Sequence, residues 1–270
     1  MMEIIQRKLC EIEQHYNVKI LLAIESGSRA WGFDSKNSDY DVRFIYIHPV
    51  DWYLSIDYPG IGNKKDVIEL PINEMLDISG WEITKALRLL RKGNPSIFEW
   101  LGSKIIYMED PHFKNQLLQL QKNYFNPKAM LHHYVNIARK NDRKYLQGES
   151  VKLKSYLYAL RSIFACKWIQ QLNEIPPIQF QSLMKNMELG EELIYEIVQL
   201  LEQKKSKDEL IVVRPIPLLN LYIEEEIKEI SSYIEALNGK KESNSIDLLN
   251  TLFRNTLKEI WSRQDELNKT

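Results

Sequence analysis

Two aspartates separated by one residue are the strongest chemical signal in the chain. Asp39 and Asp41 lie at the start of a run rich in β-branched and aromatic residues, Tyr40 to Ile47, which predicts a β-strand. Side chains alternate between the faces of a strand, so both carboxylates are expected on one face. Two such carboxylates repel each other unless a cation lies between them. Mg²⁺, which prefers oxygen ligands, is the expected ion, with Mn²⁺ as a substitute.

A Gly27-Ser28 turn precedes these aspartates. It follows an apolar run, Val18 to Ile24, that predicts a buried strand, and it precedes a segment expected to form a short helix. Backbone N–H groups at such a turn, together with the Ser28 hydroxyl, are expected to face an anion. A phosphate-binding turn about ten residues before a carboxylate pair is what metal-assisted phosphoryl transfer requires.

A two-metal site needs a third carboxylate, and three acids are candidates. Asp77 lies between Leu76 and Ile78, as an acid on a buried strand would, and Glu69 also has apolar flanks. Asp66 is the third candidate. The pattern favours Asp77 as a metal ligand and catalytic acid but does not separate the three.

Three cationic side chains near these acids could contact a nucleotide. Arg29 belongs to the Gly27-Ser28 segment, and Lys85 lies on a helix predicted directly after Asp77. Arg43 shares the strand face of the two aspartates by alternation. Contact with phosphate and a structural ion pair are both compatible with its position.

A second group of candidates lies on a predicted helix in the C-terminal half. Lys154, Tyr158 and Arg161 recur at helical spacing and form one stripe. If this stripe faces a cleft, it could bind phosphates and stack a base. A solvated helix face is the alternative. A second basic cluster fits a solvated face better than an RNA-binding one: Arg139, Lys140, Arg143 and Lys144.

The histidines and tryptophans give weaker signals. His132 and His133 are adjacent, and adjacent residues on a helix do not share a face, so no metal site is predicted there. The tryptophans are expected to pack in the core. Trp31 could in addition shape a nucleotide pocket, because it follows the Gly27-Ser28 turn.

Composition excludes several classes of protein. The net charge is −1 over 270 residues, so the whole surface is not suited to nucleic acid, although a local basic patch is compatible. Cys10 and Cys166 lie too far apart in sequence for a zinc module or a disulfide framework. The N-terminus is charged throughout, and no apolar run is long enough to cross a membrane. A cytoplasmic location without membrane contact is expected.

The predicted elements change character along the chain. Strands dominate early, with short ones at 66–70 and 76–78, and a helix from Ile83 that ends before Gly93. Ser96 to Glu99 is predicted to be a capping box that starts the next helix. After Glu109-Asp110-Pro111 nearly every segment has helical periodicity. We therefore expect an α/β domain over 1–108 and an all-helical domain over 109–270 that closes over its active site.

The motifs GSRAWGF and SDYDVRFIY, at 27–33 and 38–46, resemble the signature of the DNA polymerase β-type nucleotidyltransferase superfamily. The longer run WEITKALRLLRKGNPSIFEWL resembles the branch of this superfamily that is associated with RNA ligases, and the likeness extends through KLKSYLYALRSIFACKW. The resemblance implies an α/β fold with a short mixed sheet. It also implies phosphate contacts by Gly27 and Ser28, and Mg²⁺ bound by Asp39, Asp41 and a third acid on a later strand, which suits Asp77.

The resemblance implies transfer of a nucleotidyl group from an NTP, such as ATP, to an acceptor hydroxyl, with release of pyrophosphate. An RNA end is the favoured acceptor. Two alternatives stay open: adenylylation of a small molecule or protein, and a non-catalytic module that binds nucleotide or RNA. The second is weaker, because two carboxylates on one face are costly to hold together without a metal.

Overall fold

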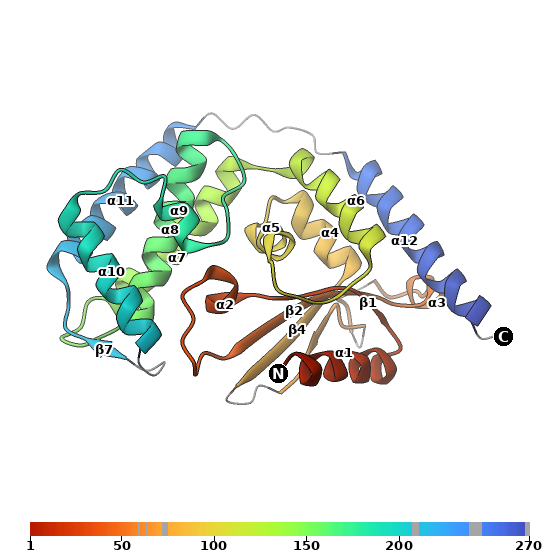
Figure 1. Ribbon diagram of the computed structural model, residues 1–270. Coiled ribbons are helices and arrows are strands. Elements are labelled where there is room, and N and C mark those ends of the chain that lie inside the picture. Colours follow the sequence, from red (N-terminus) through yellow and green to blue (C-terminus); the bar gives the residue numbers. More distant parts are fainter. Residues whose placement is uncertain (59, 63, 72–74, 207–210, 238–244, 268–270) are drawn as a thin grey trace.

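The computed structural model describes residues 1–270 except 59, 63, 72–74, 207–210, 238–244 and 268–270. A five-stranded sheet carries one helix on one face and several on the other, and a group of longer helices lies beside it (Figure 1). The order of early strands followed by helices is the one that the sequence predicts, but the strand at Ile106–Glu109 was not predicted.

The sheet is mixed, as predicted. Its strands are β1 (Lys19–Glu25), β2 (Tyr40–Ile47), β3 (Val67–Glu69), β4 (Leu76–Glu82) and β5 (Ile106–Glu109). They lie in the order β3-β4-β2-β1-β5, with β2 and β4 parallel and the other neighbours antiparallel. The parallel pair joins the strand of the predicted aspartates directly to the strand of Asp77.

Helix α1 (Met2–Tyr16) covers one face of this sheet. Its buried residues Ile5, Leu9 and Ile12 pack in one cluster with Val42 and Phe44 of β2. Alternation along β2 turns the intervening residues toward the opposite face, where the functional candidates lie.

The opposite face is covered by α4 (Ile83–Arg91), α5 (Pro95–Gly102) and α6 (Pro111–Gln121), with α12 (Ile246–Leu267) packed against α4 and α6. Glu82 is the N-cap of α4, and its buried carboxylate accepts hydrogen bonds from the N–H groups of Thr84 and Lys85. Burial raises the pKa of Glu82 above its usual range.

The predicted capping box at Ser96 is wrong. The cap of α5 is Asn94, whose side chain accepts a hydrogen bond from the N–H of Ser96, with Pro95 in the first helical position. Glu99 is therefore not needed at the helix start and points to other partners. In the sequence, Asn94-Pro95 is a stronger signal for the start of this helix than Ser96 to Glu99.

Two short helices, α2 (Gly27–Trp31) and α3 (Val50–Tyr53), lie before and after β2 in the chain. The helices after α6, apart from α12, form the second half of the molecule. They are η1 (Lys122–Tyr124), α7 (Pro127–Tyr145), α8 (Leu153–Leu172), α9 (Phe180–Met184), α10 (Glu191–Ser206) and α11 (Pro217–Ala236), with a small sheet of β6 (Val151–Lys152) and β7 (Val212–Val213). Helix α8 lies at the centre and packs against α7, α9, α10 and α11. The largest core cluster runs without a break from β1 to α12. The division at residue 108 stays a prediction.

None of the helices in the described part of the chain is both long and apolar enough to span a bilayer.

Candidate active site

The Gly27-Ser28 turn lies between β1 and the short helix α2 (Gly27–Trp31), as predicted. Gly27 has a φ of +60°, and a Cβ at this position would come within 2.0 Å of Asp41 Oδ2. Only glycine allows the backbone of the turn to approach the carboxylate this closely. Ser28 is buried, and its carbonyl accepts hydrogen bonds from the N–H groups of Gly32 and Phe33.

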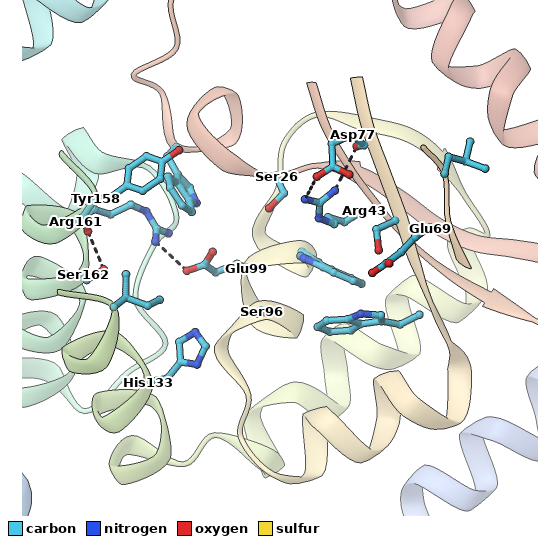
Figure 2. Close-up of a pocket in the computed structure, with 16 residues that line it drawn as sticks. Ser26, Arg43, Glu69, Asp77, Ser96, Glu99, His133, Tyr158, Arg161 and Ser162 are labelled. Carbon is cyan, nitrogen blue, oxygen red and sulfur yellow. Dashed lines mark hydrogen bonds and ion pairs between the residues drawn. The ribbon is translucent and has the colours of Figure 1, made fainter. Parts of the chain in front are cut away.

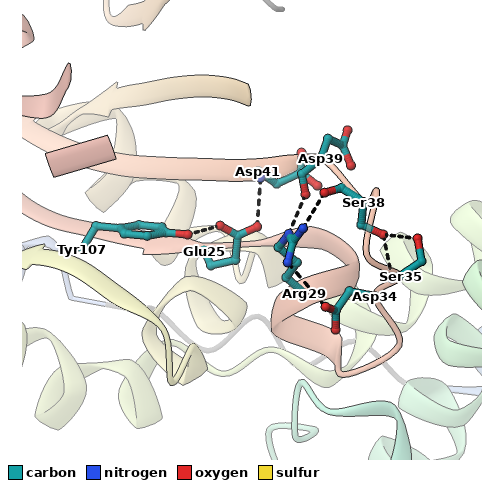
Figure 3. A network of polar contacts seen from close by, with 8 residues as sticks. All are labelled: Glu25, Arg29, Asp34, Ser35, Ser38, Asp39, Asp41 and Tyr107. Atoms are coloured by element: carbon teal, nitrogen blue, oxygen red, sulfur yellow. Dashed lines mark hydrogen bonds and ion pairs between the residues drawn. The ribbon is translucent and has the colours of Figure 1, made fainter. Parts of the chain in front are cut away.

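Asp41 is held from its backbone side by a buried acid that the sequence analysis missed. The N–H of Asp41 donates to Glu25 Oε1 at 2.9 Å, and the Tyr107 hydroxyl donates to Glu25 Oε2 (Figure 3). Glu25 has no exposed surface, and burial raises its pKa to about 6. The signal available in the sequence is an acid that ends an otherwise apolar strand.

Arg43 joins the acids of two neighbouring strands. Asp41 and Asp77 are paired residues in the parallel register of β2 and β4. One terminal nitrogen of Arg43 lies 2.7 Å from Asp77 Oδ2 and 3.2 Å from Asp41 Oδ1. All three side chains are about three-quarters buried, so this bridge balances the charge of a sheltered acid pair.

Asp39 lies just before β2, in a segment that Arg29 anchors. The Arg29 side chain donates to the carbonyls of Asp39 and Ser38, at 3.1 and 2.6 Å (Figure 3). Its guanidinium stacks on the Tyr40 ring at 3.8 Å. An ion pair of 3.5 Å joins it to Asp34. Arg29 therefore shapes the backbone that leads into β2, and these contacts use most of its donors.

The three candidates for the third acid of the predicted site lie in different places. Asp77 lies beside Asp41, whereas Glu69 is exposed on the edge strand β3 and pairs in register with Ser79. Asp66 is engaged by Lys85 of α4 at 3.0 Å. The structure brings Asp77, and neither alternative, next to Asp41.

Asp41 and Asp77 offer two of the ligands that a metal site needs. Within the described residues, no three His, Cys, Asp or Glu side chains are grouped closely enough to hold a metal ion. At the acid pair itself, Arg43 lies between Asp41 and Asp77. The carboxylates fit Mg²⁺ in donor type and charge, and the Arg43 guanidinium takes the place of the cation.

A cavity of about 540 Å³ opens beside Asp77 and Arg43 (Figure 2). Its volume is in the usual range for small-molecule sites. It is lined by residues from β2, β3, β4, α2, α5, α7 and α8, among them Ser26, Trp31, Arg43, Glu69, Asp77, Ser79, Trp81, Glu99, Trp100, His133, Tyr158 and Arg161. Of the candidates that the sequence singles out, six line the cavity: Trp31, Arg43, Glu69, Asp77, Tyr158 and Arg161. The other candidates near the turn and β2 do not line it: Gly27, Ser28, Arg29, Asp39 and Asp41.

Arg161 forms the wall opposite Asp77 (Figure 2). It is almost fully buried, pairs with Glu99 Oε1 at 2.9 Å, and donates to the carbonyl of Ile178. Its guanidinium also stacks on the Trp31 ring at 4.1 Å, and the Tyr158 ring meets Trp31 edge to face. The stripe on α8 therefore faces the cavity rather than solvent at Tyr158 and Arg161.

Other predicted residues lie elsewhere. Lys85 is bound to Asp66, and neither Lys85 nor Lys154 is among the residues that line the cavity. His133 does line it, next to Glu99, and burial lowers the pKa of its imidazole. Sequence spacing could not place His133, because its polar neighbours Glu99 and Arg161 come from other helices.

The mixed sheet, the Gly-Ser turn against the first strand and the acids on adjacent strands together define a polymerase β-like nucleotidyltransferase fold. A family model described as "RNA repair pathway DNA polymerase beta family" matches residues 1–255. The chain therefore belongs to this family. The predicted resemblance is confirmed.

Two individual proteins are similar to this chain. An uncharacterized protein of Bacillus subtilis (strain 168), YcgL, is 46% identical over 254 residues, which cover 94% of this chain and 95% of that protein. A crystal structure of a nucleotidyltransferase-like protein from Exiguobacterium sibiricum 255-15 has a TM-score of 0.33 at 13% identity, and covers 97% of this chain and 92% of that one.

Proposed function

We propose that this protein is a Mg²⁺-dependent nucleotidyltransferase that moves an NMP from an NTP to an acceptor hydroxyl and releases pyrophosphate. The observation that carries the proposal is the Asp41–Asp77 pair, placed side by side by the β2–β4 register and sheltered beside a cavity. Family membership supports nucleotidyl transfer in general. ATP is the first NTP to test.

Asp41 and Asp77, with Asp39 just before β2, are the proposed ligands of Mg²⁺, or of Mn²⁺ in its place. When bound, the ion would lower the pKa of the acceptor hydroxyl and offset the charge of the triphosphate. Arg43 would give up its place between the two acids and could then contact a phosphate oxygen, because its guanidinium already lies in the cavity wall.

The chain's own groups would position the substrates. Gly27, held against Asp41, brings the N–H groups of the turn close to the acid pair, where phosphates are expected to bind. An acid that keeps a free oxygen could accept the proton of the acceptor hydroxyl. Across the cavity, Arg161 and Tyr158 offer charge and a ring to the nucleotide.

An RNA end is the proposed acceptor. The description of the matching family, an RNA repair pathway, supports this choice over a small molecule or a protein. The net charge of −1 is compatible with binding that is limited to one basic surface.

A second candidate is a module that binds nucleotide or RNA without transfer. Arg43 favours it, because the guanidinium already neutralises Asp41 and Asp77 and removes the repulsion that would otherwise demand a metal. Such a module should bind NTP and release no pyrophosphate.

The experiment that tests the proposal follows label from each α-³²P NTP in the presence of Mg²⁺ and pooled small RNAs. Wild type should label RNA, and Asp41→Asn and Asp77→Asn should not. Asp34→Asn is the matched control, because Asp34 is a nearby acid that pairs with Arg29 and not with Arg43. Nucleotide binding without any transfer, to RNA or to small molecules and proteins tested in parallel, would favour the second candidate.

A further inference from the structure

Two tryptophans form part of the cavity wall on the side of Asp77. Trp81 of β4 and Trp100 of α5 both line the cavity, with ring centroids 4.2 Å apart and an angle of 33° between the rings. Trp100 is buried in the core, whereas Trp81 is only partly buried and packs against that core. Trp100 therefore acts as a rigid backing for a ring that remains accessible from the cavity.

The strand aligns this ring with the acid pair. Asp77, Ser79 and Trp81 alternate along β4, so they share one face of the sheet, and all three line the cavity. Four residues of strand place the backbone of Trp81 about 13 Å from that of Asp77. The wall from Asp77 to Trp81 is thus a continuous track with an acid at one end, a hydroxyl in the middle and an aromatic ring at the other.

The opposite wall offers a separate aromatic surface. Trp31 and Tyr158 meet edge to face, and Trp31 ends the helix that starts at the Gly27 turn. The proposed phosphate turn and Trp31 of this wall belong to the same short segment, so the wall suits the incoming NTP. The track along β4 is then left for the acceptor.

A nucleic-acid end fits this track better than the other acceptors. Single-stranded nucleic acid is commonly bound by stacking its bases on aromatic side chains, and stacking tolerates any base. A small-molecule or protein hydroxyl need not carry a planar ring at a fixed distance from the reacting oxygen. We propose that Trp81, backed by Trp100, is the stacking surface for the 3′-terminal base of a single-stranded nucleic-acid acceptor. This assignment rests on the proposed function.

The test measures binding without catalysis. Two 5′-fluorescein RNA octamers, identical except that one lacks its 3′-terminal base, are titrated with the full-length chain without NTP, and Kd is read from fluorescence anisotropy. Wild type should bind the complete octamer about 5- to 150-fold more tightly, which is the range for one base–aromatic stack. Trp81→Leu should lose this preference, and Trp81→Phe should keep part of it.

Equal binding of the two octamers by wild type would overturn the proposal, whether or not any variant folds. The proposal would also be overturned if folded Trp81→Leu still preferred the complete octamer. A rise in the KM for NTP rather than for RNA in that variant would overturn it as well. The two proposals can fail separately. If the protein prefers the complete octamer but transfers no label, the proposed enzymatic function is wrong and the stacking role of Trp81 stands. If it transfers label but shows no preference, the stacking role is wrong and the enzymatic function stands.

Discussion

At the scale of single residues, Asp41 is the most constrained group in the candidate site. Its N–H is fixed by Glu25, its carboxylate lies against Gly27, and Arg43 bridges it to Asp77. Glu25 and Gly27 belong to the end of β1 and the turn after it, and Asp77 belongs to β4. The position of this carboxylate is therefore set by the fold and not by β2 alone.

Gly27→Ala should reduce transfer strongly. The new Cβ would meet Asp41 Oδ2 at 2.0 Å, so the carboxylate or the turn must move. A displacement of about 1 Å at a reacting group can cost about 10²-fold in rate. The left-handed backbone conformation adds about 1–2 kcal/mol of strain, which urea unfolding would measure.

Gly32→Ala is the matched control for this substitution. Gly32 also has a positive φ, at +82°, but nothing lies within 4 Å of its added Cβ. It should lose a similar amount of stability and keep most of the activity. If both variants lose activity equally, the close approach of Gly27 to Asp41 is not what matters.

Glu25→Gln should change how stability depends on pH. Burial raises the pKa of Glu25 from 4.5 to about 6, so between these values the folded protein holds a proton that the unfolded chain has lost. Wild type therefore loses stability as the pH rises from below 4.5 to above 6, by about 2 kcal/mol in total from this group. Glutamine cannot ionise and does not have this loss.

The measurement is urea unfolding of both proteins at pH 4.5 and pH 7 with a chelator present. Relative to wild type, Glu25→Gln should gain about 2 kcal/mol between the two pH values. A difference that stays constant with pH would mean that Glu25 keeps an ordinary pKa in the folded protein.

At this scale the sequence predicts the residues that lie close in the chain and misses those brought together by folding. Asp41 and Gly27 belong to one motif, so they could be predicted. Glu25 and Glu99 could not be assigned, because their partners Tyr107 and Arg161 are far away in sequence. Arg43 was predicted on the correct strand face, and the structure shows the ion-pair alternative.

At the scale of elements, the parallel pairing of β2 and β4 is the feature on which the site depends. Strong β-propensity over Tyr40 to Ile47 predicts β2 with the bounds that it has, and β4 starts at Leu76 as expected but extends to Glu82. The register between them was not predictable, because it depends on how β3 and α4 flank β4. That register is what favours Asp77 over Glu69 and Asp66.

The Arg161–Glu99 pair connects α8 to α5 and should contribute to stability. Arg161 is nearly fully buried, so Arg161→Met would leave the Glu99 carboxylate without its cation in a sheltered place. Loss of one partner of a buried pair costs about 3–5 kcal/mol. Urea unfolding of the single variant should show a loss of this size.

The double variant Arg161→Met/Glu99→Gln provides the control. Removing both charges avoids an unpaired acid, so the double variant should be no less stable than Arg161→Met. If the double variant lost as much unfolding free energy as the two single variants added together, the two side chains would act independently. That result would contradict the role of the pair as a link between α5 and α8.

At the scale of the whole molecule, the last described helix packs against helices that come much earlier in the chain. Helix α12 packs against α4 and α6, although it follows the helices of the second half (Figure 1). Periodicity predicts that α12 is a helix, but not where it docks, since an apolar stripe fits many surfaces. The cavity lies where α7 and α8 meet the sheet side, and it needs elements from both halves.

Nucleotidyl transfer by means of the acids on β2 and β4 is the function proposed for this molecule. The most direct test compares ATP labelled with ³²P at the α position with ATP labelled at the γ position, each with Mg²⁺ and the acceptor RNA. Label should appear on the RNA from α-labelled ATP only, and none should appear with Asp41→Asn. Label on the RNA from γ-labelled ATP, or α-label transfer that persists in Asp41→Asn, would contradict it.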